Sequence, residues 1–288
     1  MEIMHRFGIK LSRESERQEF TDLGIDLPPT PTLPSGATIT SFEIGELDPR
    51  WADAMRLAAR FQITYFTSTR FDEPEIEGAS ALCMFATSNR GYPEPSEKFG
   101  FLEASFVLSD HCRKCGIGRR QVRPFRLKSA PVLKRSIMQL NWIFDEYFVA
   151  RDVWAAVFEP HGIDFWPVVL DRTGHEIESV IQLKIPHHAD LNLKDAKSTV
   201  CPMCGRTKTE MDLRGFCPEP VDIPASIFKS TQYFGPGANA YNRVLISSSL
   251  YKVIKGSQLR GVQFYPCNHD SEQLGDRSNL DQGHSIPC

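Results

Sequence analysis

The chain has 288 residues, of which 41% are apolar and 10% aromatic, enough for a packed core and too apolar for a globally disordered protein. A net charge of −3 argues against a general nucleic-acid binder. There is neither an apolar run of the ~18 residues that span a bilayer nor a signal-peptide core at the N-terminus. We therefore expect a cytoplasmic protein without a membrane partner.

The N-terminal part mixes helix and strand patterns. We expect a helix within residues 12–20, an extended proline-rich connection over 28–34 and a strand over 38–44. Asp48-Pro49 is typical of a helix start, since aspartate caps helices and proline fits the first helical position. Residues 1–91 are thus predicted to form an N-terminal α+β region.

Further elements follow along the chain. Three strands are predicted over 63–67, 79–87 and 101–108, and a helix is predicted to begin at Ser129-Ala130-Pro131. Later patterns predict a helix after Asp152, a hairpin of 165–170 with 176–185, a helix over 247–255 and a strand over 262–265. Residues 268–288 are polar and predict a flexible tail. The predicted fold class is α+β, with mixed sheets and helices.

Two short motifs share one pattern, Cys-x-x-Cys-Gly. The first is Cys112 and Cys115 followed by Gly116, and the second is Cys201 and Cys204 followed by Gly205. Two residues between the cysteines allow a tight turn that directs both sulfurs to one point, and the glycine can adopt positive φ without a Cβ clash. Each motif therefore supplies half of a tetrahedral metal site.

Together, the two motifs predict one structural Zn²⁺ bound by Cys112, Cys115, Cys201 and Cys204, as in a zinc ribbon. A redox dithiol or disulfides remain alternative interpretations of each pair, although eight cysteines in a reducing compartment favour thiols and metal ligands. About 85 residues separate the pairs, so a shared ion would close residues 116–200 into a long excursion.

Other candidate ligands are less well placed in the sequence. His111 adjoins the first motif, and we assign it a supporting role beside the sulfurs, with direct ligation as the alternative. Cys217 could replace a motif cysteine, but a buried structural thiol is the preferred interpretation. His187 and His188 are adjacent and would point to different sides of a strand, which favours a polar loop.

Charge is divided unevenly between the first motif and the excursion. Residues 113–135 hold nine Lys/Arg and no acid, whereas residues 145–178 hold eight acids and two arginines. Such runs are usually solvated faces, but the basic one could contact phosphates and the acidic one a basic protein. No phosphate-binding glycine loop, nucleophile elbow or zinc-protease motif occurs, which favours a protein that is not an enzyme.

The paired motifs resemble the double-CXXCG motif family, a bacterial family first noted as myxobacterial paralogues, whose members include immunity proteins of polymorphic toxin systems. The matching residues are Cys112, Cys115 and Gly116 with Cys201, Cys204 and Gly205. A C-terminal element is also similar, comprising residues 245–250 and 259–266. The first pair departs from the family pattern, since it lacks the proline that follows Cys201 and lies farther from the N-terminus.

The resemblance covers residues 92–267 and implies a zinc-binding domain there. It also implies a protein partner, and the expected function is a non-enzymatic zinc protein that neutralises a bacterial toxin, as in toxin–antitoxin pairs. Two alternatives stay open, namely nucleic-acid binding through residues 113–135 and an enzyme whose zinc is purely structural. The sequence does not determine the oligomeric state.

Overall fold

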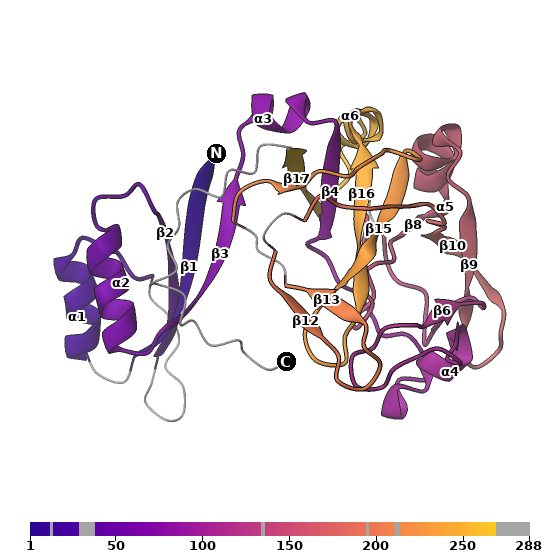
Figure 1. Ribbon diagram of the computed structural model, residues 1–288, viewed down its shortest axis with the longest axis horizontal. Helices are drawn as coiled ribbons and strands as arrows, with labels where there is room; N and C mark the ends of the chain where they lie inside the picture. Colours follow the sequence, from indigo (N-terminus) through magenta and orange to yellow (C-terminus); the bar gives the residue numbers. More distant parts are fainter. Residues whose placement is uncertain (12–13, 29–37, 134–135, 194–195, 211–213, 269–288) are drawn as a thin grey trace. The chain divides into compact units, whose positions relative to one another are not determined.

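The computed structural model describes residues 1–11, 14–28, 38–133, 136–193, 196–210 and 214–268. It has the predicted mixed α+β composition, with more strand than helix (Figure 1). The described chain forms two compact units. Unit 1 contains residues 1–75 and 214–216, and unit 2 contains the rest up to residue 268. The predicted division after residue 91 marks the extent of the family resemblance and stays a prediction.

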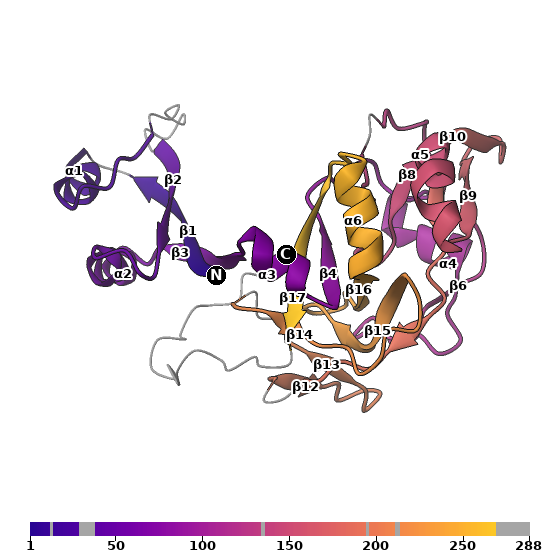
Figure 2. The same cartoon turned by 90° about the horizontal axis from the view of Figure 1, so that it is seen from above.

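Unit 1 is a three-stranded antiparallel sheet covered by helices. The sheet has the order β2-β1-β3. Its elements are β1 (Glu2–Leu11), α1 (Glu14–Asp22), β2 (Thr38–Gly45), α2 (Trp51–Arg60) and β3 (Thr64–Arg70). Phe7 and Ile44 of the sheet pack with Phe20 of α1 and Ala58 of α2, so both helices cover the same sheet face (Figure 2). β2 confirms the strand predicted over 38–44, whereas β1 was missed.

The predicted cap of the second helix is wrong in position. α2 begins at Trp51, and its N-cap is Arg50, which makes no side-chain cap hydrogen bond. Asp48 instead accepts hydrogen bonds from the backbone N–H and the guanidinium of Arg50. The Asp-Pro pair therefore lies in the turn before the helix, where the Trp51 N–H donates to the Asp48 carbonyl at 2.9 Å.

Unit 2 is built on an eight-stranded sheet. Its path is β12-β13-β15-β16-β4-β17-β14, with β11 also paired to β15. The strands are β4 (Ala81–Ala86), β11 (His188–Ala189), β12 (Ser198–Val200), β13 (Thr207–Thr209), β14 (Cys217–Pro218), β15 (Ile227–Phe234), β16 (Tyr241–Ser247) and β17 (Val262–Asn268). α3 (Glu73–Gly78) precedes β4, and α6 (Ser248–Gly256) follows β16 with Ser247 as its N-cap. α6 confirms the helix predicted near residues 247–255.

The excursion between the two cysteine pairs contributes a second, four-stranded sheet. Its order is β7-β9-β10-β8, from β7 (Arg126–Leu127), β8 (Phe148–Ala150), β9 (Phe165–Leu170) and β10 (Glu176–Leu183). β9 and β10 confirm the predicted hairpin. Between β8 and β9 the chain forms the short helical segments α5 (Arg151–Val153), η2 (Trp154–Phe158) and η3 (Glu159–His161). Tyr147, Phe158 and Ile181 join Leu82 and Ile246 in a core shared with the larger sheet.

Two predicted elements near the first motif are wrong. Residues 101–108 are not one strand: after η1 (Glu97–Phe99), the chain forms α4 (Phe101–Ser105) and then β5 (Phe106–Val107), which pairs with β6 (Arg120–Gln121). Phe101 and Ser105, four residues apart, are both buried, so a helical repeat competes with the alternating pattern.

The helix predicted to begin at Ser129 is also absent from the described residues. Residues 136–140 are extended: the Ile137 N–H donates to the Arg260 carbonyl at 2.7 Å, and Met138 bridges Phe148. Residues 137–140 are all buried, whereas a surface helix exposes part of every turn. The predicted tail, 268–288, lies outside the described residues except Asn268.

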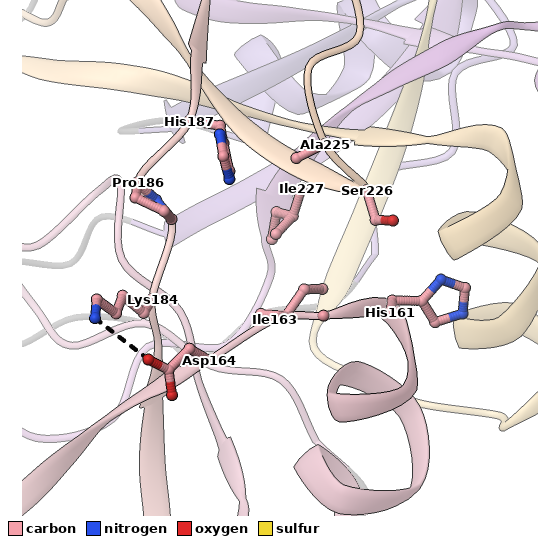
Figure 3. Close-up of a pocket in the computed structure, with 10 residues that line it drawn as sticks. His161, Ile163, Asp164, Lys184, Pro186, His187, Ala225, Ser226 and Ile227 are labelled. Atoms are coloured by element: carbon pink, nitrogen blue, oxygen red, sulfur yellow. Dashed lines mark hydrogen bonds and ion pairs between the residues drawn. The ribbon is translucent and has the colours of Figure 1, made fainter.

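A small pocket of about 160 Å³ lies in unit 2, away from both cysteine motifs (Figure 3). Ile163, Pro186 and Ile227 form part of its wall, and His187 lines it as well. The Lys184 ammonium donates to the Asp164 carboxylate at 3.2 Å beside it. His188 lies outside the lining residues, in β11, so the two adjacent histidines have different surroundings.

Candidate metal centre

The first motif is the turn of a short hairpin. β5 and β6 pair as Phe106 with Gln121 and Val107 with Arg120, and Cys112 and Cys115 lie in the turn between them. Within the turn, the Cys112 N–H donates to the Ile117 carbonyl at 2.9 Å, and the Gly116 N–H donates to the Cys112 carbonyl at 2.7 Å. Backbone hydrogen bonds within the turn therefore hold its conformation without a contribution from an ion.

The second motif repeats this arrangement. β12 and β13 pair in antiparallel register, with Val200 opposite Thr207, and the motif is the turn between them. The Cys201 N–H donates to the Arg206 carbonyl at 2.9 Å, and the Gly205 N–H donates to the Cys201 carbonyl at 2.9 Å. Both motifs thus show the same hydrogen bonds at equivalent positions.

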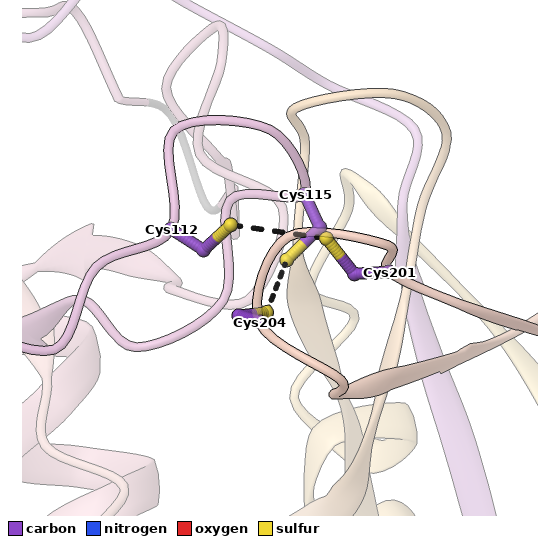
Figure 4. Close-up of side chains that lie close together, drawn as sticks. All are labelled: Cys112, Cys115, Cys201 and Cys204. Carbon is purple, nitrogen blue, oxygen red and sulfur yellow. Dashed lines mark hydrogen bonds between the residues drawn. The ribbon is translucent and has the colours of Figure 1, made fainter.

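The four sulfurs converge on one point (Figure 4). The Cys112 and Cys201 sulfurs are 3.8 Å apart, the Cys115 and Cys204 sulfurs are 3.6 Å apart, and all four lie within 4.8 Å of one another. A tetrahedral ion with Zn–S bonds of about 2.3 Å separates its sulfurs by about 3.8 Å. A disulfide would need about 2.05 Å, and the four cysteines are free. The cluster therefore fits a metal ion held by four sulfurs.

The end of β15 and the turn before β16 pack against the four cysteines. Ile117 and Ala240 are buried against the cysteines, and Tyr233 of β15 packs beside them. The turn before β16 also approaches Gly116 so closely that a Cβ at this position would lie 2.0 Å from the Ala238 carbonyl oxygen. Because φ is +82° at Gly116, both the space and the backbone require glycine there.

Arg206 connects the two turns. Its Nε donates to the Cys204 sulfur at 3.4 Å, Nη1 donates to an Asp110 carboxylate oxygen at 2.7 Å, and Nη2 donates to the Asp110 carbonyl at 2.7 Å. The guanidinium thus joins the second motif to the residues just before the first. No local pattern predicts this contact, since the partners are 96 residues apart.

The thiols differ in their readiness to lose a proton. Hydrogen bonds from Arg206 lower the pKa of Cys204 to about 6, and backbone N–H groups of Met203 and Cys204 lower the pKa of Cys201. Burial raises the pKa of Cys115 to about 11. Cys201 and Cys204 therefore ionise more readily than an ordinary thiol, whereas Cys115 ionises less readily unless a cation is close to it.

His111 and Cys217 are not part of the four-sulfur set. Among the described residues His111 makes no hydrogen bond to a sulfur; burial, followed by nearby arginines, lowers its pKa. Cys217 lies in β14 and contacts Cys83 instead. The described residues thus offer the four predicted cysteines as the set whose donor atoms all converge.

The basic stretch is largely exposed around the first motif. Arg119 approaches Asp145 at 3.7 Å and Arg126 approaches Asp171 at 3.8 Å. Within the described chain, the other basic residues of the stretch are exposed and make no ion pair: Arg113, Lys114, Arg120, Arg123 and Lys128. This surface therefore carries uncompensated positive charge.

The acidic segment is mostly neutralised by partners. Glu146 is buried and accepts hydrogen bonds from the Lys229 ammonium at 2.5 Å and from Gln182 at 2.9 Å. Four more acids contact cations, namely Asp145, Asp164, Asp171 and Glu176. The negative charge available to a basic partner is smaller than the sequence count implies.

Comparisons with known proteins identify no relative. No family model, no curated protein and no solved structure matches the chain. Among the described residues, none of the helices is both long enough and apolar enough to cross a membrane.

Proposed function

We propose that this chain is a non-enzymatic binding protein whose fold is held together by one structural Zn²⁺. The observation that carries the proposal is the convergence of four cysteine sulfurs from two equivalent hairpin turns. Cys112, Cys115, Cys201 and Cys204 would fill all four positions of a tetrahedral ion, leaving none for a catalytic water. Function then belongs to the surface around the ion, not to the ion.

The proposed partner is a protein, and the proposed role is neutralisation of a bacterial toxin. Support comes from the resemblance to the double-CXXCG motif family, carried by the two motifs and by the C-terminal element. That element runs from the end of β16 into α6 and then through β17. Its Gly261 has φ of +95°, and a Cβ there would meet the Ile137 carbonyl oxygen at 2.0 Å. Both the backbone conformation and the close approach of Ile137 therefore require glycine at position 261.

The first experiment measures zinc in the purified chain by inductively coupled plasma mass spectrometry. We expect one Zn²⁺ per chain in the parent and none in Cys201→Ser, with the exposed neighbour change Met203→Ala as a matched control. Full zinc in Cys201→Ser, or no zinc in the parent, would contradict the structural-zinc proposal.

The second experiment tests the partner. The probe is the product of the gene adjacent to the one encoding this chain, expressed in bacteria alone and together with this chain. We expect growth arrest by the probe alone, rescue on co-expression, and a complex of the two proteins on gel filtration. A toxic probe that is neither bound nor neutralised would contradict the immunity role, as would a probe without toxicity.

Nucleic-acid binding is a second candidate, favoured by the exposed basic residues around the first motif. Five of them make no ion pair within the described chain (Arg113, Lys114, Arg120, Arg123 and Lys128), so they are available for phosphates. The test is fluorescence anisotropy with a labelled 20-base-pair DNA duplex at several salt concentrations. Phosphate contacts predict a slope of about −0.9 per contact in a plot of log K against log salt. Binding lost on combined reversal of Arg120 and Arg123 to Glu would favour this candidate; no binding at low salt would remove it.

A further inference from the structure

An aromatic cluster outside the cysteine motifs lies at the surface of unit 2. The Trp142 ring contacts Tyr92 at 4.5 Å and Phe99 at 4.9 Å between centroids. On Phe101 it stacks at 6.0 Å, with the two ring planes 19° apart. Phe101 is buried, whereas Tyr92 is 46% exposed and Phe99 is 53% exposed. The cluster therefore has a buried base and presents two rings to solvent.

Hydrogen bonds join the two segments that carry these rings. The Asn141 N–H donates to the Gly91 carbonyl at 3.0 Å, and the Asn141 side-chain amide donates to the same carbonyl at 2.8 Å. Trp142 directly follows Asn141, and Tyr92 directly follows Gly91. The position of these two rings side by side is therefore set by the backbone, although 50 residues separate the two segments.

The backbone is strained at this cluster. Lys98, Phe99 and Trp142 have φ of +50°, +57° and +68°, in the left-handed region that residues with a Cβ rarely adopt. Within the described ranges of the chain, five non-glycine residues have positive φ, and these three are among them. Strained residues gather at ligand-binding sites. Here the strain accompanies a phenylalanine ring that stays half in solvent, so burial of apolar surface does not explain it.

Positive charge flanks the exposed rings. Arg90 lies two residues before Tyr92, Lys98 lies next to Phe99, and both basic side chains are exposed. Neither makes an ion pair within the part of the chain that the structure describes. Glu97 of η1 is exposed as well and offsets one of these two charges. One positive charge is thus left over at the rings themselves.

The basic stretch adds to this charge from alongside. The Glu94 N–H donates to the Arg126 carbonyl at 2.9 Å, and Arg123 Nη1 donates to the Glu103 carbonyl at 3.4 Å. The stretch therefore lies against the segment that carries three of the rings. Arg123 and Lys128 are exposed and make no ion pair within the described residues. The exposed rings and the unpaired cations are thus neighbours in unit 2.

We propose that this cluster binds single-stranded nucleic acid, with unpaired bases stacked on Tyr92 and Phe99. Phosphates then contact Arg90 and Lys98. Aromatic rings beside positive charge are the two components with which proteins bind single strands, since every base has a π-face and every nucleotide a phosphate. A protein partner would bury the rings but leave the two cations without regularly spaced anions. The bases of a duplex are already stacked on one another, so this site is independent of the duplex candidate, of the toxin partner and of the zinc ion.

The test is fluorescence anisotropy of the zinc-loaded full chain with a labelled single strand of about 12 nucleotides. RNA and DNA probes of one sequence are compared, because the 2′-OH distinguishes these two sources, and binding of either supports the site. We expect log K to fall with log salt, with a slope of about −0.7 per phosphate contact. If neither strand binds at about 50 mM salt, the proposal is wrong.

Variants separate stacking from charge. Phe99→Ala removes one stacked base and is expected to weaken single-strand binding about 5- to 150-fold. The matched control is Phe66→Ala, which removes a ring that is 63% exposed on β3 of unit 1 and is expected to bind like the parent. Arg90→Gln combined with Lys98→Gln is expected to flatten the salt slope by about 0.7 for each contact removed.

Three results would overturn the site. One is equal single-strand affinity of the parent and a folded Phe99→Ala chain; should that variant not fold, Tyr92→Ala decides in the same way. Another is weaker binding of a duplex in Phe99→Ala, since the rings would then not be reading unpaired bases. The third is loss of the adjacent-gene product in Phe99→Ala without any single-strand binding, which would assign the rings to the protein partner. Duplex binding through Arg120 and Arg123 alone leaves the stacking result unchanged.

Discussion

At the scale of single residues, the two glycines after the cysteine pairs have different roles. Both have positive φ, +82° at Gly116 and +70° at Gly205. A Cβ at Gly116 would lie 2.0 Å from a backbone oxygen, whereas one at Gly205 would meet nothing within 4 Å. Two positions that look identical in the sequence therefore differ in how much a methyl group disturbs them.

We expect Gly205→Ala to lower the free energy of unfolding by about 1–2 kcal/mol, the usual cost of a left-handed L-residue. Gly116→Ala adds overpacking against a backbone that cannot move aside, so a loss of about 2–5 kcal/mol is expected. Denaturant unfolding of both zinc-loaded variants provides the measurement. Equal losses at the two positions would show that the turn before β16 does not press on Gly116.

His5 in unit 1 is a buried titratable residue with an unusual set of partners. Its Nε2 donates to the Glu46 carboxylate at 2.8 Å, Nδ1 accepts from the Thr67 hydroxyl at 3.1 Å, and its ring stacks on Trp51 at 4.3 Å. Burial lowers the pKa of His5 and outweighs the hydrogen bond to Glu46, which raises it. The folded chain thus prefers the neutral ring.

The lowered pKa of His5 makes the folded chain less stable at acidic pH. The unfolded ring takes up a proton near pH 6.5 and the folded one only at lower pH, so stability falls as pH drops from about 6.5 toward the folded pKa. We expect His5→Gln to flatten this part of the stability–pH curve, as measured by thermal unfolding between pH 7.5 and 5. The solvent-exposed His175 offers the control His175→Gln; equal curves for both variants would argue against a role for His5.

Glu46 acts in a separate pH window. Burial raises its pKa, but hydrogen bonds from Arg214 and His5 reverse this and leave the pKa below its ordinary value. One of these bonds runs from Arg214 Nη2 to a Glu46 oxygen at 2.7 Å. The stability that Glu46 provides is therefore present above about pH 4.5 and is lost below it, which keeps it distinct from the His5 effect.

At the scale of elements, local patterns were predictable and long-range contacts were not. The cysteine turns could be found because ligand spacing and glycine lie within five consecutive residues. The strand β15 was not predicted because its buried stretch includes Lys229 and Ser230. These polar residues interrupt the apolar pattern by which a core strand is identified. Residues 136–140 were predicted as helix because their apolar spacing fits one, whereas Ile137 is held by Arg260, far along the chain.

Lys229 of β15 also forms a buried ion pair with another part of the chain. Lys229 of β15 reaches Glu146, the residue before Tyr147, and both are buried. Removing one member of a buried ion pair leaves an unpaired charge and costs about 3–5 kcal/mol. We therefore expect Lys229→Met to lower the free energy of unfolding by that amount in denaturant titrations.

The double change Lys229→Met with Glu146→Leu is the informative companion. It removes both charges and replaces them with apolar groups, which is often neutral. Recovery of most of the lost stability is expected. If the double variant is as unstable as the single one, the hydrogen bond from Gln182 to Glu146 matters more than the ion pair.

At the scale of the whole molecule, the four-cysteine cluster ties the ends of the excursion together. The residues between the pairs form their own sheet, β7-β9-β10-β8, and share a core with the larger sheet. An ion would fix both hairpin turns at once, and binding an ion to the folded state adds directly to folding free energy.

We expect Cys201→Ser to loosen the excursion as a whole. Hydrogen exchange followed by mass spectrometry should show faster exchange in β9 and β10 as well as in the second turn, with Met203→Ala behaving as the parent. Faster exchange confined to residues 198–209 would mean that the core shared with the larger sheet, rather than the ion, holds the excursion in place.

The separation of the two turns also has a consequence during synthesis. Cys112 and Cys201 are 89 residues apart, so at 5–20 residues per second the first turn leaves the ribosome about 4–18 s before its partner exists. For that interval the nascent chain presents two cysteine thiols without their two partners, with enough time to bind an ion or to be oxidised. The order of translation therefore exposes the first pair, and not the second, to the metal and redox state of the cell.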